Sequence, residues 1–245
     1  MTRPILAVFA ASLLASCATT SEAPVAPADP IALAVADSRR PATDVARDEA
    51  RKPYEIVSFA GVEPGMVVAE MAPGGGYYTR ILAESVGPTG KVYALQSSFM
   101  ARNPDRMAAY YALAEEYGNV TVLVVEDYAS LQVPEPVDLV WTTENYHDFV
   151  NAGVEPANAW AYNALKPGGI YFVEDHSAPG TGLSATSTIH RIDPAAVTEQ
   201  VIGAGFALEA NSDVLANPDD PKDIRPGEVT VGVSEKFALR FRKPG

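Results

Sequence analysis

Apolar residues recur along the chain in two patterns, as short continuous runs and as sets spaced three or four residues apart. Runs bounded by Gly, Pro or Asn are typical of buried strands, whereas the wider spacing is typical of helices that cover a core with one face. The runs predict strands over residues 66–69, 91–95, 120–125, 137–141, 170–173, 206–214 and 236–242. The wider spacing predicts helices over residues 44–61 (with a break at Pro53), 77–86, 104–117, 156–165 and 194–203.

The order of these elements predicts the fold class. The first five strands alternate with helices, and such units form a mostly parallel sheet that helices cover on both faces. The last two strands are joined by the Pro- and Asp-rich segment 217–228, which has no helical pattern, and a pair joined in this way can be antiparallel. We therefore expect one doubly wound α/β domain over residues 42–245.

The first residues have the pattern of an export signal. A basic start at Arg3 is followed by an apolar run over residues 5–15, which is shorter than the roughly 20 residues that span a bilayer as a helix. This pattern predicts a signal peptide over residues 1–16. The run ends Leu-Ala-Ser-Cys, which resembles the bacterial lipoprotein box, and the resemblance implies a lipid on Cys17 and a location on the periplasmic face of a membrane. The alternative is an ordinary signal peptide followed by an incidental cysteine.

The segment after Cys17 is rich in Ala and Pro. Its prolines, among them Pro24, Pro27 and Pro30, disfavour a continuous helix and favour extended chain. Residues 17–41 are therefore expected to form the lipidated cysteine and a flexible tether to the domain.

Composition and charge narrow the classes of partner. The 245 residues contain 18 Lys and Arg against 31 Asp and Glu, a net charge of −13, which would repel a nucleic-acid backbone. A single cysteine allows neither an internal disulfide nor a Cys-rich zinc module. A metal cluster of Asp148, Asp175 and His176 lacks a spacing motif, so no metal is expected. The expected partners are a small-molecule or envelope substrate and, through the lipid alone, a membrane.

The clearest functional pattern is a glycine turn between the strand at 66–69 and the helix at 77–86. Three consecutive glycines, Gly74, Gly75 and Gly76, permit left-handed backbone and leave main-chain N–H groups open to a polar ligand beside the helix N-terminus. A dinucleotide fingerprint would place Gly or Ala where Thr79 stands, and the chain has no P-loop motif. The turn therefore predicts a nucleotide-like ligand at the carboxyl edge of the sheet.

The acidic Glu70, a small spacer and Gly74-x-Gly76 together resemble the first motif of the class I S-adenosylmethionine-dependent methyltransferases. Other segments that resemble this family are residues 87–94, 126–127 and 165–169. Residues 73–79, 145–148, 175–176 and 190–193 resemble more narrowly a group of exported bacterial proteins classed as predicted methyltransferases. The resemblance implies a Rossmann-like sheet of seven strands with an antiparallel last strand, and S-adenosylmethionine as cofactor.

The resemblance also implies roles for single residues. Ala72 to Gly76 would wrap the methionine part of the cofactor while Glu70 orders the turn, and Asp127 and Tyr128 would contact the adenine. One position departs from the family, because Gln96 stands where an acidic residue usually binds the ribose, and a neutral acceptor is the weaker one. The cofactor-binding residues that we expect are Glu70, Ala72, Gly74, Gly75, Gly76, Tyr78, Thr79, Gln96, Asp127, Tyr128 and Glu144.

Candidate catalytic residues follow the next two strands. His147 and Asp148 come after the strand at 137–141, and His176 closes the strand at 170–173. Methyl transfer needs alignment and, for a protonated nucleophile, a base, a role that a neutral imidazole suits. We therefore expect His147, Asp148 and His176 to be catalytic. Arg191 either holds a substrate carboxylate or pairs with one of the chain's acids.

Two functions remain open. One is an S-adenosylmethionine-dependent methyltransferase that acts on a small molecule or on an envelope component. The other is a catalytically inactive, ligand-binding lipoprotein that retains the methyltransferase fold. The absence of an Asn/Asp-Pro-Pro-Tyr/Phe motif and of a cysteine in the domain argues against methylation of nucleic-acid bases.

Overall fold

The computed structural model describes residues 28–230 and 233–245 of the chain. The predicted signal peptide, Cys17 and the first part of the predicted tether lie outside the described residues. The strands are β1 (Val67–Met71), β2 (Lys91–Ser97), β3 (Val120–Val125), β4 (Val137–Thr143), β5 (Leu165–His176), β6 (Ala207–Ser212) and β7 (Lys236–Arg242). The helices are α1 (Pro30–Val35), α2 (Ala42–Val45), α3 (Asp48–Arg51), α4 (Pro53–Ala60), α5 (Tyr77–Val86), α6 (Ser98–Ala101), α7 (Pro104–Tyr117), α8 (Tyr146–Ala152), α9 (Glu155–Ala164), α10 (Thr186–Ile189) and α11 (Pro194–Gly203), with a 3-10 turn at Pro226–Glu228.

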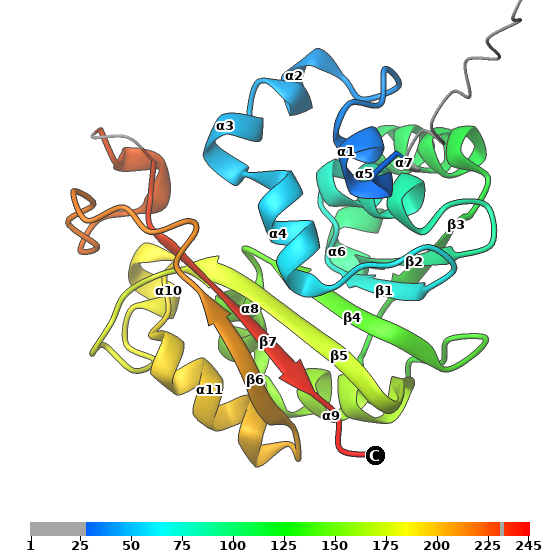
Figure 1. The fold of residues 1–245 in the computed structure, drawn as a ribbon. Coiled ribbons are helices and arrows are strands. Elements are labelled where there is room, and N and C mark those ends of the chain that lie inside the picture. Colours follow the sequence, from blue (N-terminus) through cyan, green and yellow to red (C-terminus); the bar gives the residue numbers. More distant parts are fainter. Residues whose placement is uncertain (1–27, 231–232) are drawn as a thin grey trace, which may run out of the picture.

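The seven strands form one sheet in the order β3-β2-β1-β4-β5-β7-β6. The first five are mutually parallel, and β7 lies antiparallel between β5 and β6 (Figure 1). The predicted seven-stranded, mostly parallel sheet with an antiparallel last strand is confirmed. Met71 at the end of β1 pairs with both Leu95 of β2 and Thr142 of β4, so these strands end at one edge of the sheet.

The sheet is covered on both faces because successive strand side chains point to opposite sides. Val68 of β1 belongs to a core that contains side chains of α1, α4, α5 and α7, whereas its neighbour Ala69 belongs to a core with side chains of α8, α9 and α11. The helices of the first core lie on one side of the sheet, and those of the second core lie on the other side (Figure 1). Strands β1, β4 and β5 are buried on both faces, which explains why their sequences contain continuous apolar runs.

The predicted elements match the observed ones best where capping residues mark both ends. Helices α5 and α7 and strands β3 and β7 have the predicted bounds. The structure divides the predicted helix 44–61 into α2, α3 and α4, because Lys52, just before Pro53, adopts a left-handed backbone (φ 44°). Helix α8 is absent from the prediction, which left the chain after β4 as a loop.

The predicted tether is wrong from Pro30 onward. Residues Pro30–Val35 form α1, in which Asp29 caps the helix start and Ala34 is fully buried. Proline is favourable in the first helical turn, since its missing N–H has no intrahelical acceptor there. Arg40 is also buried and donates to Asp48 at 2.8 Å. The folded domain therefore begins by residue 30 and not at residue 42.

Among the residues that the structure describes, no helix is both long enough and apolar enough to cross a membrane.

Candidate functional site

The glycine turn follows β1 at the carboxyl edge of the sheet. A Cβ atom built on Gly74 or Gly75 meets no heavy atom within 4 Å, so the main chain there is open. A Cβ on Gly76 would lie 2.6 Å from Leu113 Cδ1, and its φ of 84° is left-handed. Gly76 also begins α5 without a side-chain cap, which leaves first-turn N–H groups without an intramolecular acceptor. Two of the three glycines thus expose the turn, and the third packs it against α7.

Glu70 fastens the turn to the helix that follows it. Its carboxyl group is buried and accepts a hydrogen bond from the Thr79 hydroxyl, which in turn contacts the hydroxyl of Tyr110 on α7. Burial raises the pKa of Glu70 to about 8. Glu70 therefore joins the end of β1 to α5, on either side of the glycine turn, and it also borders the cavity at that turn. Thr79 is fully buried in this network, so the prediction that it contacts a ligand is wrong.

Three cavities surround the turn. The turn cavity, about 180 Å³, is lined by Gly74, Gly75, Arg47, Arg51, Glu144 and Asn145, among others. The β3 cavity, about 330 Å³, is lined by Ser97, Ser98, Phe99, Asp127 and Tyr128. The α7 cavity, about 370 Å³, contains Gln96, Met100 and Tyr110 and also touches Gly74 and Gly75. Ala72 lines both the turn cavity and the β3 cavity, so the two meet at the end of β1.

Two residues at the edge have left-handed backbones although neither is glycine. Ala72, directly after β1, has φ 49°, and Glu144, directly after β4, has φ 58°. Asn145 links the two, because its side-chain amide donates to the Ala72 carbonyl at 3.1 Å. Such conformations are unfavourable for L-residues and cluster at functional sites. The strain here lies between the first strand and its neighbour β4.

A fourth cavity continues the turn cavity toward β7. This β7 cavity, about 420 Å³, is lined by Arg47, Arg51 and Glu144, which also line the turn cavity, and by His176, Ser234 and Lys236. Its charges are paired: Glu144 contacts Arg51 and accepts from Lys236 at 2.9 Å, and Lys236 lies 3.1 Å from the buried Glu174. Burial opposes ionisation of Glu144, but Lys236 and Arg51 outweigh it and lower the pKa of Glu144 to about 2.

The structure separates the three predicted catalytic residues. His176 lines the β7 cavity, where its Nδ1 lies 2.9 Å from the Ser234 hydroxyl, and burial lowers the pKa of His176 to about 4. His147 and Asp148 line none of the four cavities described above. His147 is buried and bonded through Nδ1 to Asp175 at 2.9 Å; burial lowers its pKa, but Asp175 outweighs this and raises it. His176 therefore lines a cavity that His147 and Asp148 do not line, and two bonds to Asp175 hold His147 in place.

Arg191, for which two roles were open, pairs with an acid. Its guanidinium is fully buried and forms two bonds to Asp220, of 2.8 and 3.0 Å. It also donates to the carbonyl of Ile224 at 2.7 Å. Arg191 therefore anchors the segment between β6 and β7 and is not free to hold a substrate.

We compared the sequence and the fold with those of known proteins. No protein-family model matches the chain. The chain is 29% identical over 127 residues to the protein-L-isoaspartate O-methyltransferase of Ignicoccus hospitalis, covering 51% of this chain and 54% of that relative. The chain thus spans about half the length of the curated relative it matches. A solved S-adenosylmethionine-dependent methyltransferase from Aquifex aeolicus has a TM-score of 0.58 at 18% identity, over 80% of this chain and 92% of that one.

The chain has the S-adenosylmethionine-dependent methyltransferase fold. A solved structure described as a possible exported protein from Bordetella parapertussis is also similar, with a TM-score of 0.54 at 18% identity over 82% of this chain and 68% of that one. These comparisons support S-adenosylmethionine as the cofactor.

Two observations on this methyltransferase fold test whether the cofactor fits. First, the space beside Gly74 and Gly75, which we call the cradle, is open because neither residue has a side chain, so a ligand can approach the main chain there. Gln96 donates through Nε2 to the Gly74 carbonyl at 2.9 Å, while its buried Oε1 has no partner. A buried acceptor without a donor costs about 1–3 kcal/mol, and ribose hydroxyls are donors that would satisfy it. The residues present therefore fit the cofactor.

Most of the predicted cofactor residues lie around these cavities. Ala72, Gly74, Gly75, Tyr78, Gln96, Asp127, Tyr128 and Glu144 each line at least one of them. Sequence reasoning missed Arg47, Arg51 and Lys236. Arg47 directly precedes α3, Arg51 ends α3, and Lys236 begins β7. No local motif marks them, since only the packing of α3 and β7 against the strand ends brings them there.

Proposed function

We propose that this protein is an S-adenosylmethionine-dependent methyltransferase that methylates a carboxylate group on a small molecule or envelope component. The observation that carries the proposal is that neighbouring cavities at the edge of the sheet have lining residues in common. Ala72 joins the β3 cavity to the turn cavity, and Arg47, Arg51 and Glu144 join the turn cavity to the β7 cavity. We infer that these adjoining cavities form one groove with room for a nucleoside, for its sulfonium-bearing chain and for an acceptor.

The groove assigns each part of the cofactor to residues of this chain. Asp127, Tyr128 and Ser97 of the β3 cavity would hold the adenine. Gln96, which lines the adjoining α7 cavity together with Gly74 and Gly75, would hold the ribose. The main chain at Gly74 and Gly75 would hold the methionine part. The cofactor would supply an electrophilic methyl group when bound.

The chemistry of the β7 cavity favours an anionic acceptor. Arg47, Arg51 and Lys236 line it, against the carboxylates of Glu144 and the buried Glu174. His176, whose pKa is about 4, is neutral at pH 7 and a weak base there. A carboxylate needs no base because it is already deprotonated, and it is attracted by the three cations. The Ignicoccus hospitalis relative is by its name an O-methyltransferase, which supports the same class of acceptor atom.

The residues of the groove act by alignment. Arg47 and Lys236 would hold the acceptor carboxylate with one oxygen facing the turn cavity, and the left-handed Glu144 would keep Arg51 and Lys236 in place. A carboxylate held in this way would receive the methyl group that the bound cofactor supplies, and it would not have to lose a proton. The chain contributes position and charge, which are the main requirements of this reaction.

Cofactor binding is tested by filling the cradle. We expect Gly75→Val to weaken the binding of S-adenosylmethionine and S-adenosylhomocysteine to the full-length chain by at least about ten-fold, measured by calorimetry. A Cβ at this position meets no atom within 4 Å and the backbone is not left-handed, so we expect the variant to fold. Gly203→Val, which also enters open space, is the matched control and should bind as the parent does. Absence of binding heat at millimolar cofactor would contradict the proposal and leave the inactive lipoprotein as the better description.

The acceptor class is tested by turnover. We expect release of S-adenosylhomocysteine with carboxylic acids and none with the corresponding amides, since the amides lack the charge that the three cations attract. Cofactor binding without turnover on any carboxylate, or equal turnover on acid and amide, would contradict the carboxylate assignment alone.

We also propose that the protein is exported and anchored by a lipid on Cys17. The support is the Leu-Ala-Ser-Cys sequence after the basic and apolar start. In a Gram-negative host, Cys17→Ala should move the protein from the membrane fraction to the soluble fraction, whereas Ser16→Ala, which keeps a small residue before the cysteine, should not. Membrane retention of Cys17→Ala would refute the anchor.

A further inference from the structure

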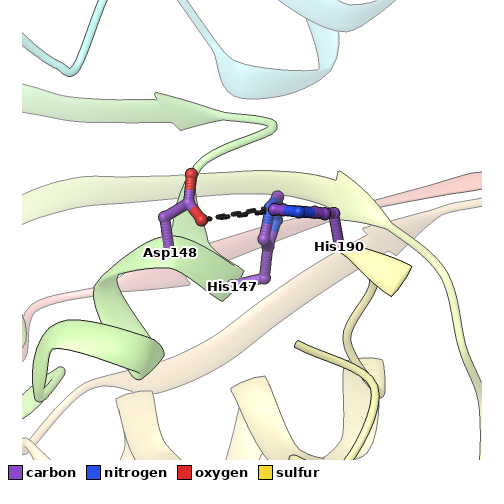
Figure 2. A group of neighbouring side chains, drawn as sticks. All are labelled: His147, Asp148 and His190. Atoms are coloured by element: carbon purple, nitrogen blue, oxygen red, sulfur yellow. Dashed lines mark ion pairs between the residues drawn. The ribbon is translucent and has the colours of Figure 1, made fainter. Parts of the chain in front are cut away.

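Two histidines and an aspartate meet outside the proposed groove. His147 and Asp148 begin α8, and His190 follows α10; Figure 2 shows the Asp148 carboxylate facing the two imidazole rings. We call these three residues the His–Asp–His cluster. One nitrogen of each ring and one carboxylate oxygen all lie within 4.8 Å of one another. The sequence predicts no metal site here, because His190 is far from the other two in the chain.

The separations within the cluster suit a shared ion better than direct bonds. His147 Nε2 lies 3.5 Å from Asp148 Oδ1, and His190 Nδ1 lies 3.9 Å from the same atom. Both separations are longer than a normal hydrogen bond. Ligand atoms about 2.0–2.1 Å from a tetrahedral zinc ion lie roughly 3.4 Å apart. The two distances to Asp148 Oδ1 are therefore near the spacing of ligands around one ion, and the two imidazole nitrogens lie within 4.8 Å of each other.

Asp175 orients the buried ligand of the cluster. This carboxylate is fully buried and accepts from His147 Nδ1 at 2.9 Å and from the His147 main-chain N–H at 2.8 Å. Nδ1 therefore carries the ring proton, and Nε2 presents a lone pair toward Asp148. A carboxylate behind a histidine is the usual outer shell of a metal-bound imidazole.

The backbone that carries His190 is also held in place. The next residue, Arg191, is fixed by its buried pair with Asp220, and Ile192 pairs with Ser177 just after β5. The rings of His190 and His147 meet edge to face at 5.4 Å. A site whose ligands are held by rigid neighbours loses little entropy when it binds an ion.

We propose that the His–Asp–His cluster binds one divalent transition-metal ion, with Zn²⁺ as the best-fitting ion. Two imidazole nitrogens and one carboxylate oxygen form a donor set that zinc favours, and three protein ligands leave a fourth position for water or another ligand. That position faces solvent, since the side chains of Asp148 and His190 are 58% and 43% exposed. The ion would tie α8 to the segment after α10. This proposal does not rest on the proposed methyl transfer.

Metal titration of the full-length chain tests the site. After treatment with EDTA and its removal, we expect Zn²⁺ to bind at one ion per chain in calorimetry, and Co²⁺ to give the visible absorption of a four-coordinate site. His190→Ala and Asp148→Asn each remove one exposed ligand and should weaken Zn²⁺ binding by about ten-fold or more. Both residues lie at the surface, so these variants should fold.

Two further variants separate the site from general metal binding. His176→Ala removes the remaining histidine, which lies in the β7 cavity, and should leave Zn²⁺ affinity unchanged. Asp175→Asn should weaken Zn²⁺ by about 10–100-fold if it folds, since outer-shell partners have effects of this size. The proposal is overturned if the parent chain binds no Zn²⁺, or if His190→Ala and Asp148→Asn bind it as tightly as the parent.

Discussion

The carboxyl edge of the sheet has two halves that are built differently. After β1, the wall of the groove is main chain: Gly74 and Gly75 expose their backbone. After β4 and β5, the wall is a dense set of charged side chains, in which Arg51, Glu144 and Lys236 form one network of ion pairs. The first half relies on the absence of side chains, and the second half on their pairing.

Because the two halves are built differently, they are suited to different kinds of ligand. Main-chain N–H groups in an open turn bind a fixed, polar ligand in one geometry, and they tolerate little added volume. Charged side chains bind a further charge best where one of them is only weakly paired, as Arg47 of the β7 cavity is: its ion pair with Asp44 measures 3.9 Å. Under the proposed function, the first half would hold the constant cofactor and the second half the variable acceptor.

The largest effect is expected from breaking the buried Arg191–Asp220 ion pair, which lies outside both halves and anchors the segment between β6 and β7. Arg191→Met should lower the free energy of unfolding by about 3–5 kcal/mol, since it leaves the buried Asp220 carboxylate without its partner. Urea denaturation measures the loss. Arg242→Met is the matched control, because Arg242 and its partner Glu209 are partly exposed and such pairs contribute about 0–1 kcal/mol. Equal losses in the two variants would show that burial of the pair is unimportant.

The next effect concerns the packed glycine of the first half. Gly76→Ala should destabilise the fold by at least about 1–2 kcal/mol, because its φ of 84° is unfavourable for alanine. The contact of the new Cβ with Leu113 at 2.6 Å adds to this loss. Gly75→Ala, which enters open space, should leave the unfolding free energy nearly unchanged in the same urea experiment. A stable Gly76→Ala protein would mean that the three glycines are equivalent.

The smallest effect is a pH dependence carried by Glu70. Its pKa is raised from 4.5 to about 8 in the folded chain, so the folded state keeps a proton that the unfolded state releases between these values. Stability from this group is complete below pH 4.5 and falls as the pH rises toward 8, by at most about 1.4 kcal/mol per pH unit. We expect the parent to lose more stability than Glu70→Gln between pH 6 and pH 7 in urea. Parallel pH profiles would contradict a protonated Glu70.

Much of the fold could be predicted because its signals are local. The bounds of α5 and α7 follow from the Gly-Pro and Asn-Pro punctuation around them, and the parallel sheet follows from the alternation of elements. Helix α1 was missed because proline was interpreted as disfavouring helix, although Pro30 occupies the first helical position. The burial of Ala34 in the core shared with α5 stabilises that short helix, and no local signal reports it.

The parts of the site that come from a single chain segment could be predicted from the sequence. The parts that depend on contacts between several segments could not. The glycine turn and Asp127 lie in their expected places because each directly follows a strand. The separation of His147 from His176 was not predictable, since it depends on α8 and on the buried bond from His147 to Asp175.

The amino-acid sequence by itself determined the order of strands and helices, the glycine turn and the residue types at each strand end, because hydrophobic periodicity and turn chemistry act over a few neighbouring residues. Only the tertiary structure decided which charged groups meet: Arg51 with Glu144, Arg191 with Asp220, and His190 with His147. These partners lie far apart in the chain, and their pairing depends on how the helices pack over the ends of the strands.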